Sequence, residues 1–363
     1  MLAVLIPMPD VYVLLLGGLV CGSLAGAAAQ FGRLCTFAAI EDAVLAGDFR
    51  RARAFGLALA TALALTQALV AAKLLDLSGN PYAQSQIDLS GLVVGATFFG
   101  LGMSLVGTCG FGLLLRAGTG DLRAFVTAGI LAIAAAAATG GLLAPLRLWI
   151  SALVRMDVGA PGWPALRNSI SAVSPLTLEG IVSATLVVLL VVIIFGSARF
   201  RRRRSLILAG LGLGLAVSGG WIVTGTLADP FGAHRLESLT FVAPLARVVL
   251  LTMGETIYQA TFAVGTVFGV AAGSYLVAWG RDELRWEAFD DQREMRRHVL
   301  GALMMGLGGV LARGCTIGQG LSAASALSLT APIAILFMIL GARIGLYYLV
   351  EGRTLFDLWH RRY

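Results

Sequence analysis

The chain has 363 residues, of which 58% are hydrophobic and 13% are charged, and its mean hydropathy is +0.86. Soluble domains carry about 25% charged residues, so this composition excludes an ordinary soluble domain and indicates a polytopic membrane protein. The formal net charge of +7 does not indicate nucleic-acid binding, because most of the arginines lie in the loops between apolar stretches.

About nine stretches are long and apolar enough to cross a membrane, since a spanning helix needs about 20 mostly apolar residues. In chain order they lie near residues 11–30, 53–73, 89–107, 122–144, 176–197, 205–223, 257–280, 297–313 and 331–350. The sequence therefore predicts an all-α polytopic membrane protein with about nine transmembrane helices.

The arginine distribution predicts how these helices are oriented. The loops that follow odd-numbered spans hold clusters at 50–53, 116–123, 199–204, 281–297 and 353–362, whereas the other loops are poor in arginine. The arginine-rich side of a membrane protein normally faces the cytoplasm, so we expect the amino terminus outside and the carboxyl terminus inside. The first residues lack the basic segment of a cleavable signal peptide.

One passage occurs twice, and each copy ends on a cysteine. Residues 95–109 read GATFFGLGMSLVGTC, and residues 301–315 read GALMMGLGGVLARGC. A constant offset of 206 residues aligns Cys109 with Cys315 and also Gly112 with Gly318. Glycine-spaced apolar helices that repeat internally and break at a reactive side chain are typical of transporters built from duplicated halves.

The repeat divides the chain into a first half (1–145), an external loop with a linking helix (146–204) and a second half (205–363). Each half is expected to contain two units in which a span is followed by a short broken helix and a return span. Four spans and one linking helix precede the second half, so that half enters the membrane in the opposite orientation. We therefore expect inverted-repeat halves with short re-entrant helices.

Three of the four predicted breaks lie at a cysteine, namely Cys35, Cys109 and Cys315, and the fourth is expected around Thr224 without one. Non-helical backbone at membrane depth is tolerated only where protein or a water-lined cavity satisfies it. The free N–H groups that begin a short helix attract anions, so the breaks predict a path for an anion. Cys21, in the middle of the first span, is expected to be an ordinary buried side chain.

Residues beside these breaks complete the predicted path. Arg33 and Arg313 each precede a cysteine by two residues and are expected to attract an anion, while glycines would let the backbone approach it. The predicted set is Cys35, Cys109, Cys315, Arg33, Arg313, Gly110, Gly112, Thr316, Gly318, Gln319 and Gly320. Nearby arginines favour a thiolate, whereas a neutral S–H donor would repel an anion less, and the sequence leaves both forms open.

Other side-chain patterns exclude several kinds of site. The four cysteines contain no C-x-x-C pair and the three histidines lie at span edges or in the tail, so neither a metal site nor a disulfide framework is expected. We also expect no cofactor and no nucleic-acid partner. Glu41 and Asp42 would oppose an anion, so they are expected at the cytoplasmic mouth or paired with Arg50 or Arg51.

FGRLC at 31–35, GTCGFG at 107–112 and RGCTIGQGLS at 313–322 resemble three cysteine motifs of the YeeE/YedE family of bacterial sulfur-transport membrane proteins. The resemblance implies a non-enzymatic inner-membrane transporter or channel that takes up thiosulfate or a related sulfur anion. It implies that the three cysteines contact the substrate through their S–H groups, and that a small cytoplasmic sulfur-carrier protein of the TusA type receives the sulfur. Many members carry His where this chain has Gln319, which leaves a selenium compound as an alternative substrate.

Two other kinds of protein remain compatible with the sequence. A membrane-embedded sulfurtransferase or redox protein could use the cysteines as a relay, although the wide spacing of the cysteines argues against ordinary dithiol exchange. A structural or assembly membrane protein would tolerate substitution of every cysteine.

Overall fold

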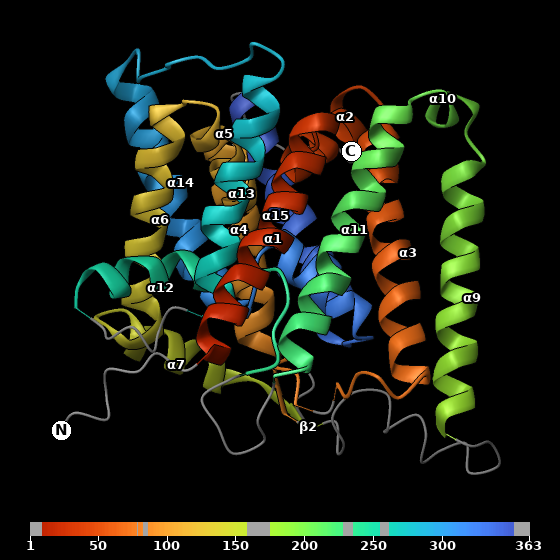
Figure 1. The fold of residues 1–363 in the computed structure, drawn as a ribbon. Coiled ribbons are helices and arrows are strands. Elements are labelled where there is room, and N and C mark those ends of the chain that lie inside the picture. The colour runs from red at the N-terminus through yellow and green to blue at the C-terminus, as the bar shows by residue number, and fades with distance from the viewer. Residues whose placement is uncertain are drawn as a thin grey trace, which may run out of the picture.

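The computed structural model describes residues 9–77, 79–82, 86–157, 175–227, 235–254 and 261–351, and these are mostly helical (Figure 1). The arginine cluster predicted at 353–362 lies outside the described residues. The helices are α1 (Pro9–Gly32), α2 (Thr36–Leu45), α3 (Arg50–Ala71), α4 (Leu89–Val106), α5 (Gly110–Gly118), α6 (Leu122–Gly140), α7 (Ala144–Leu153), α9 (Pro175–Phe195), α10 (Ala198–Arg201), α11 (Arg204–Gly225), α12 (Val242–Thr252), α13 (Phe262–Trp279), α14 (Gln292–Leu311), the π-helical η2 (Gly318–Ala323) and α15 (Thr330–Glu351). Strands β1 (Gln86–Asp88) and β2 (Arg155–Asp157) pair antiparallel at one end of the helices.

The prediction of an all-α polytopic membrane protein is confirmed. Among the described residues, seven helical segments are long and apolar enough to cross a membrane, and they include α1, α3, α4, α6, α11, α13 and α15. The other two predicted spans are also helical. They correspond to α9, whose described apolar part is shorter, and to α14, which begins with charged residues.

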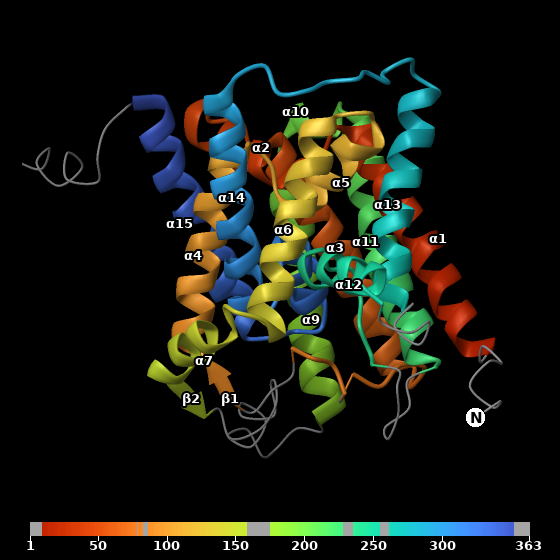
Figure 2. The ribbon, with the colours of Figure 1, turned by 90° about the vertical axis from the view of Figure 1, so that its left-hand side faces the viewer.

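The same helix pairs form twice, each time with the roles of the first and second half of the chain reversed. Helix α1 packs along α13, and its counterpart α11 packs along α3. In the same way α4 packs along α15, and α14 packs along α6. Helices α1 and α11 cross the molecule in opposite directions, as do α4 and α14 (Figures 1 and 2). This is the arrangement that inverted halves produce.

Glycines let these helices approach closely. A Cβ atom on Gly18 of α1 would collide with the carbonyl oxygen of Phe262, and one on Gly265 of α13 would collide with that of Leu15. Gly100 and Gly341 have the same relation across α4 and α15. In lipid there is no hydrophobic driving force between helices. Small residues at the interface let the backbones approach closely, and the resulting van der Waals packing stabilises the helix pair.

The helix before the fourth break ends where the sequence predicted it. Thr224 is buried in the last turn of α11, which ends at Gly225, and its hydroxyl donates to the carbonyls of Gly220 and Glu237. The next described helix is α12, and its N-cap, Phe241, follows Cys35 by the same offset of 206 residues. The segment between α11 and α12 contains no cysteine, so this break differs from the other three.

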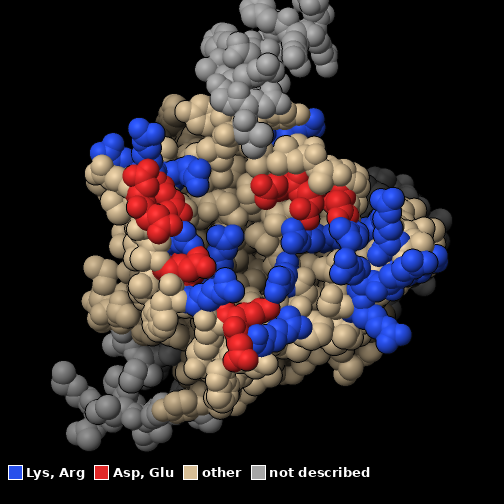
Figure 3. Space-filling view, turned by 90° about the horizontal axis from the view of Figure 1, so that it is seen from above, with Lys and Arg blue, Asp and Glu red and all other residues tan. Residues whose placement is uncertain are grey.

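Arginines gather on the face of the molecule where α2 and α10 lie (Figure 3). Carboxylates are interleaved with them, and several ion pairs form. Arg51 binds Asp42 at 2.8 Å, which confirms the expected pairing of that carboxylate, and Arg50 binds Asp48. The hydrogen bond from Arg50 holds the pKa of Asp48 below its ordinary value. This face is therefore a mixed-charge surface with an excess of arginine.

Candidate functional site

The three cysteines predicted at breaks occupy similar positions, each directly before a short helix. Cys35 is the N-cap of α2 and Cys109 is the N-cap of α5, both with extended backbone, and Cys315 precedes the helical turns that lead into η2. Cys109 and Cys315 are fully buried, and Cys35 is half-buried. The thiol of Cys109 lies within electrostatic range of the other two, so the fold brings all three into one region.

Each thiol faces a threonine from another broken segment. The sulfur of Cys35 lies 3.4 Å from the Thr108 hydroxyl, and the Thr36 hydroxyl lies close to the thiol of Cys109. The break between α1 and α2 and the break between α4 and α5 therefore exchange contacts in both directions. In the other half, the Thr240 hydroxyl lies 4.0 Å from the sulfur of Cys315.

The sulfur of Cys315 also accepts a backbone hydrogen bond, whereas the side chain of Cys109 makes no cap bond to α5. The N–H group of Gly318 donates to the sulfur of Cys315 at 3.4 Å. This sulfur thus takes the place of the side-chain oxygen that usually caps a helix. The bond leaves the S–H proton of Cys315 available to a further acceptor.

A contact between threonine hydroxyls joins the two halves at the centre. The Thr316 hydroxyl donates to the Thr36 hydroxyl at 3.3 Å. Since Thr36 also reaches Cys109, the polar groups form a continuous connection from one half to the other. Thr316, predicted for the path from its position beside Cys315, is thus brought next to the first half.

The predicted glycines divide into two groups. A Cβ atom on Gly112 would collide with the hydroxyl of Thr108, and one on Gly318 would lie 2.6 Å from the hydroxyl of Thr240. Gly110 and Gly320, by contrast, have room, because the nearest atoms to a Cβ would be 3.7 and 3.8 Å away. Gly112 and Gly318 are therefore the positions where a side chain would displace the threonine beside a thiol.

Arg33 and Arg313 each bind a carboxylate. Arg33 contacts Glu283 at 2.7 Å with its side chain 71% exposed, and Arg313 contacts Asp88 at 2.7 Å. Both arginines have a positive φ, at the turn where α1 or α14 ends. The hydrogen bond from Arg33 holds the pKa of Glu283 below its ordinary value. Each of the two arginines that were predicted to attract an anion is therefore paired with a carboxylate, which offsets its charge.

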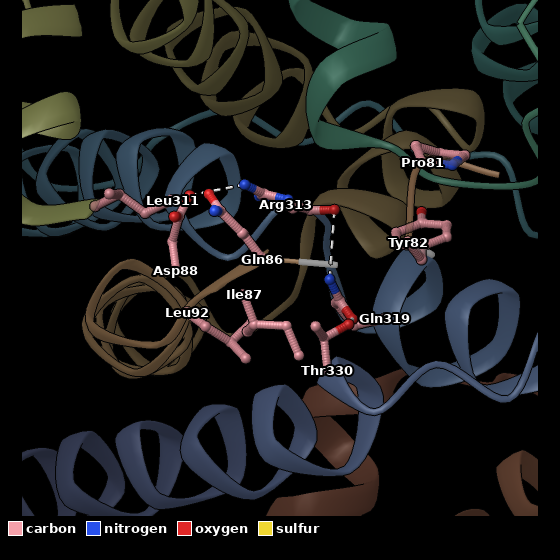
Figure 4. Close-up of a pocket in the computed structure, with 10 residues that line it drawn as sticks. All are labelled: Pro81, Tyr82, Gln86, Ile87, Asp88, Leu92, Leu311, Arg313, Gln319 and Thr330. Carbon is pink, nitrogen blue, oxygen red and sulfur yellow. Dashed lines mark hydrogen bonds and ion pairs between the residues drawn. The ribbon is translucent and has the colours of Figure 1, made fainter. Parts of the chain in front are cut away.

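A narrow pocket opens beside β1 (Figure 4), at the end of the molecule opposite α2 and α10 (Figure 2). Its lining consists of Pro81, Tyr82, Gln86, Ile87, Asp88, Leu92, Leu311, Arg313, Gln319 and Thr330. Its interior has room for little more than one water molecule. The Gln319 amide donates to the carbonyl of Ala312 at 2.8 Å and accepts from the Thr330 hydroxyl at 3.1 Å. Gln319 therefore ties the end of α14 to the start of α15 at the wall of this pocket.

Tyr82 and Thr240 are site residues that the sequence analysis missed. Tyr82 lies in the loop between α3 and α4, and Thr240 lies in the extended segment before α12. Neither belongs to a repeated or cysteine-containing motif. Only the offset of 206 residues from Leu34 and Cys35 to Thr240 and Phe241 could have pointed to the second segment.

A second cavity lies between α2, α3 and α15, with an empty volume of about 1100 Å³. Thr36 and Thr316 line its inner end, and Gly320 lies beside them, while most of the remaining lining is apolar. The central hydroxyl pair is therefore the polar end of an otherwise apolar groove.

Comparison with known proteins agrees with this architecture. A family described as sulphur transport matches residues 31–344. The thiosulfate transporter TsuA of Escherichia coli is 25% identical over 354 residues, which cover 90% of this chain and 92% of that protein. The thiosulfate transporter TsuA of Spirochaeta thermophila is 26% identical over 347 residues, which cover 89% of this chain and 96% of that protein. The chain therefore belongs to the sulphur-transport family of membrane proteins.

Proposed function

We propose that this protein takes up thiosulfate or a related inorganic sulfur anion through a central path lined by Cys35, Cys109 and Cys315. The observation that carries the proposal is that three thiols, each beside a threonine hydroxyl, meet where the broken helices converge. The similarity to transporters named for thiosulfate supports the choice of substrate.

In this path the thiols act as neutral hydrogen-bond donors. Thiolates would repel the anion, whereas an S–H group donates weakly to a soft sulfur acceptor and releases it readily. When no anion is present, each thiol contacts a threonine hydroxyl. As the anion moves along the path, it replaces these thiol–hydroxyl contacts one at a time. No covalent bond of the anion changes, so we propose no enzymatic step.

We also propose a location and an orientation. The arginine-rich face, with clusters at 50–53, 116–123, 199–204 and 281–297, would lie in the cytoplasm of a bacterial cell, with the chain in the inner membrane. The amino terminus would then be outside and the carboxyl terminus inside. An excess of arginine on that face suits a small acidic partner surface, so we propose that a TusA-like carrier protein accepts the sulfur there (Figure 3).

Growth on thiosulfate tests the proposal. The chain would be expressed in a bacterium that lacks its own thiosulfate uptake systems, with thiosulfate as the sole sulfur source. We expect rescue by the unaltered chain and loss of rescue in Cys35→Ala, Cys109→Ala and Cys315→Ala. Cys21→Ala is the matched control, because Cys21 packs against Leu14 and Phe262 in a separate apolar cluster. Absence of rescue with the protein present in the membrane would contradict the proposal.

A cysteine-relay sulfurtransferase is the alternative that the grouping of three thiols favours. In that reaction a thiolate would attack the outer sulfur of thiosulfate, form a persulfide and release sulfite. Exposure of the purified protein to thiosulfate would then add the mass of one sulfur atom. An unchanged intact mass, together with rescued growth, would support transport without covalent transfer. Competition by a selenium compound during uptake would test the alternative substrate.

A further inference from the structure

The phenol of Tyr82 stands between the pocket beside β1 and the buried thiol of Cys315. Tyr82 lines the pocket (Figure 4), and its hydroxyl lies close to the hydroxyl of Thr240. Thr240 in turn lies 4.0 Å from the sulfur of Cys315, which is fully buried. The two hydroxyls therefore lie between the pocket and this thiol.

The hydroxyls of Tyr82 and Thr240, which we call the barrier, both lie close to Gly318. A Cβ atom on Gly318 would lie 2.6 Å from the hydroxyl oxygen of Thr240 and 3.3 Å from that of Tyr82. Only a glycine at this position leaves space for both hydroxyl groups in front of Cys315. The barrier thus consists of the Tyr82 and Thr240 hydroxyl groups, which lie next to each other above Gly318.

The backbone of Tyr82 is held on both sides by hydrogen bonds, and its side-chain hydroxyl ends close to that of Thr240. The N–H group of Tyr82 donates to the Asn80 side chain at 2.7 Å, and its carbonyl accepts from the Ser328 hydroxyl at 3.1 Å. Rotation of the phenol about its side-chain bonds would move its hydroxyl away from Thr240 and leave these backbone bonds intact. Opening by side-chain rotation therefore requires no movement of the loop.

The phenol remains a hydrogen-bond donor throughout the physiological pH range. Burial raises the pKa of Tyr82, so its oxygen stays protonated. The nearby Glu237 carboxylate is bound to Arg247 at 3.1 Å, which offsets its charge. An anion in the pocket would therefore meet a neutral O–H donor before it meets the thiol.

We propose that Tyr82 is the outer gate of the path and its first hydrogen-bond donor. In the closed state the phenol lies against Thr240 and separates the pocket from Cys315. In the open state the phenol turns, donates a hydrogen bond to the anion, and exposes Cys315 to the pocket. The identity of the anion that passes the gate rests on the proposed uptake function. The effect of the gate on access to Cys315 does not depend on that function.

Reaction of Cys315 with a membrane-impermeant methanethiosulfonate reagent tests the gate directly. Right-side-out and inside-out vesicles that contain the full chain would be labelled, and mass spectrometry of peptides would measure the modification of each cysteine separately. The variants are Tyr82→Ala, which removes the phenol, and Tyr82→Phe, which keeps the ring and removes the donor. Tyr348→Ala is the matched control, because that tyrosine is 60% exposed on α15.

We expect Tyr82→Ala to raise the labelling rate of Cys315 at least several-fold in right-side-out vesicles only. Tyr82→Phe should raise it less, because the ring still fills the opening, and Tyr348→Ala should not change it. Equal rates in Tyr82→Ala and the unaltered chain would overturn the gate, as would a rise only in inside-out vesicles. The labelling rate of Cys35 reports on general unfolding, and a parallel increase there would also contradict a local gate.

Added thiosulfate separates the gate from the transport proposal. If thiosulfate slows the labelling of Cys315 in Tyr82→Ala, both proposals are supported. If labelling rises in Tyr82→Ala but thiosulfate gives no protection, the gate stands and the proposed substrate is wrong. Uptake of radioactive thiosulfate should fall in Tyr82→Phe, because the first donor is lost while the barrier remains.

Discussion

The sulfur of Cys35 lies 3.4 Å from the hydroxyl of Thr108, the residue that immediately precedes Cys109. Because the Thr36 hydroxyl in turn reaches Cys109, the two breaks of the first half hold each other's thiols. These contacts join segments that lie about 70 residues apart in the chain, so each thiol is positioned by the other break as well as by its own helix. This reciprocal arrangement leads to the first prediction.

Replacement of Thr108 by valine should impair uptake, because valine keeps the shape of threonine but cannot bond Cys35. A hydrogen bond contributes about 0.5–1.5 kcal/mol, so a reduction in uptake of roughly 2- to 10-fold is expected. Thr108→Ser, which keeps the hydroxyl, should retain most of the activity. Initial uptake rates of radioactive thiosulfate in vesicles measure the effect, and equal rates in both variants would show that the hydroxyl has no role.

Substitutions of the predicted glycines should separate into two classes. Gly112→Ala and Gly318→Ala should abolish or strongly reduce uptake, because the new methyl group displaces the threonine beside a thiol. Gly110→Ala and Gly320→Ala should remain active, because their methyl groups meet neighbours only at van der Waals distance. Growth on thiosulfate at equal membrane expression gives the comparison, and uniform loss across all four would contradict the geometry.

The close approach of α1 and α13 predicts a loss of stability in Gly265→Ala. The methyl group would collide with the backbone carbonyl of Leu15, and overpacking of this kind typically costs about 1–3 kcal/mol. Gly129→Ala in α6 is the control, since no atom lies within 4 Å of a Cβ there. Thermal unfolding in detergent should show a lower midpoint for the first variant, and an unchanged or higher midpoint for the second.

Phe241→Cys should not create a fourth functional thiol. Although Phe241 is equivalent to Cys35 by the repeat, its ring is fully buried and packs 4.9 Å from the ring of Phe111. Cysteine would leave a cavity, and losses of about 3–5 kcal/mol are typical when a buried phenylalanine is cut back to alanine. We expect lower stability without faster uptake, whereas Phe241→Leu should lose less. Faster uptake in Phe241→Cys would indicate that this break carries substrate contacts of its own.

The ion pair of Arg33 and Glu283 predicts a small dependence of stability on pH. Because the hydrogen bond from Arg33 lowers the pKa of Glu283 in the folded state, the pair stabilises the fold above the ordinary glutamate pKa. This contribution is lost as the pH falls through the lowered folded-state value. An exposed pair contributes at most about 1 kcal/mol. Unfolding midpoints of the unaltered chain and Glu283→Gln should differ slightly at pH 7 and converge in acid, whereas a constant difference would exclude the ion pair as the cause.

Much of the fold could be predicted because it follows from local properties of the chain. Hydropathy over about 20 residues marks a spanning helix wherever it occurs, and the offset of 206 residues reveals the two related halves. The breaks at Cys35, Cys109 and Cys315 were predictable because each carries a repeated or cysteine-containing motif. The end of the helix near Thr224 was predictable in the same way, because the apolar stretch ends there, and α11 ends at Gly225.

The amino-acid sequence by itself determined the membrane class, the duplicated halves and the three candidate thiols, since each depends on residue type and spacing along the chain. Only the tertiary structure decided which groups meet those thiols. The contacts of Thr240 with Cys315, of Arg313 with Asp88 and of Gln319 with Thr330 depend on how separate segments pack. Hydropathy and periodicity describe one segment at a time, whereas a hydrogen bond requires two groups at a definite distance. The barrier at Tyr82 was therefore invisible until the loop, the break before α12 and the turn into η2 were seen together.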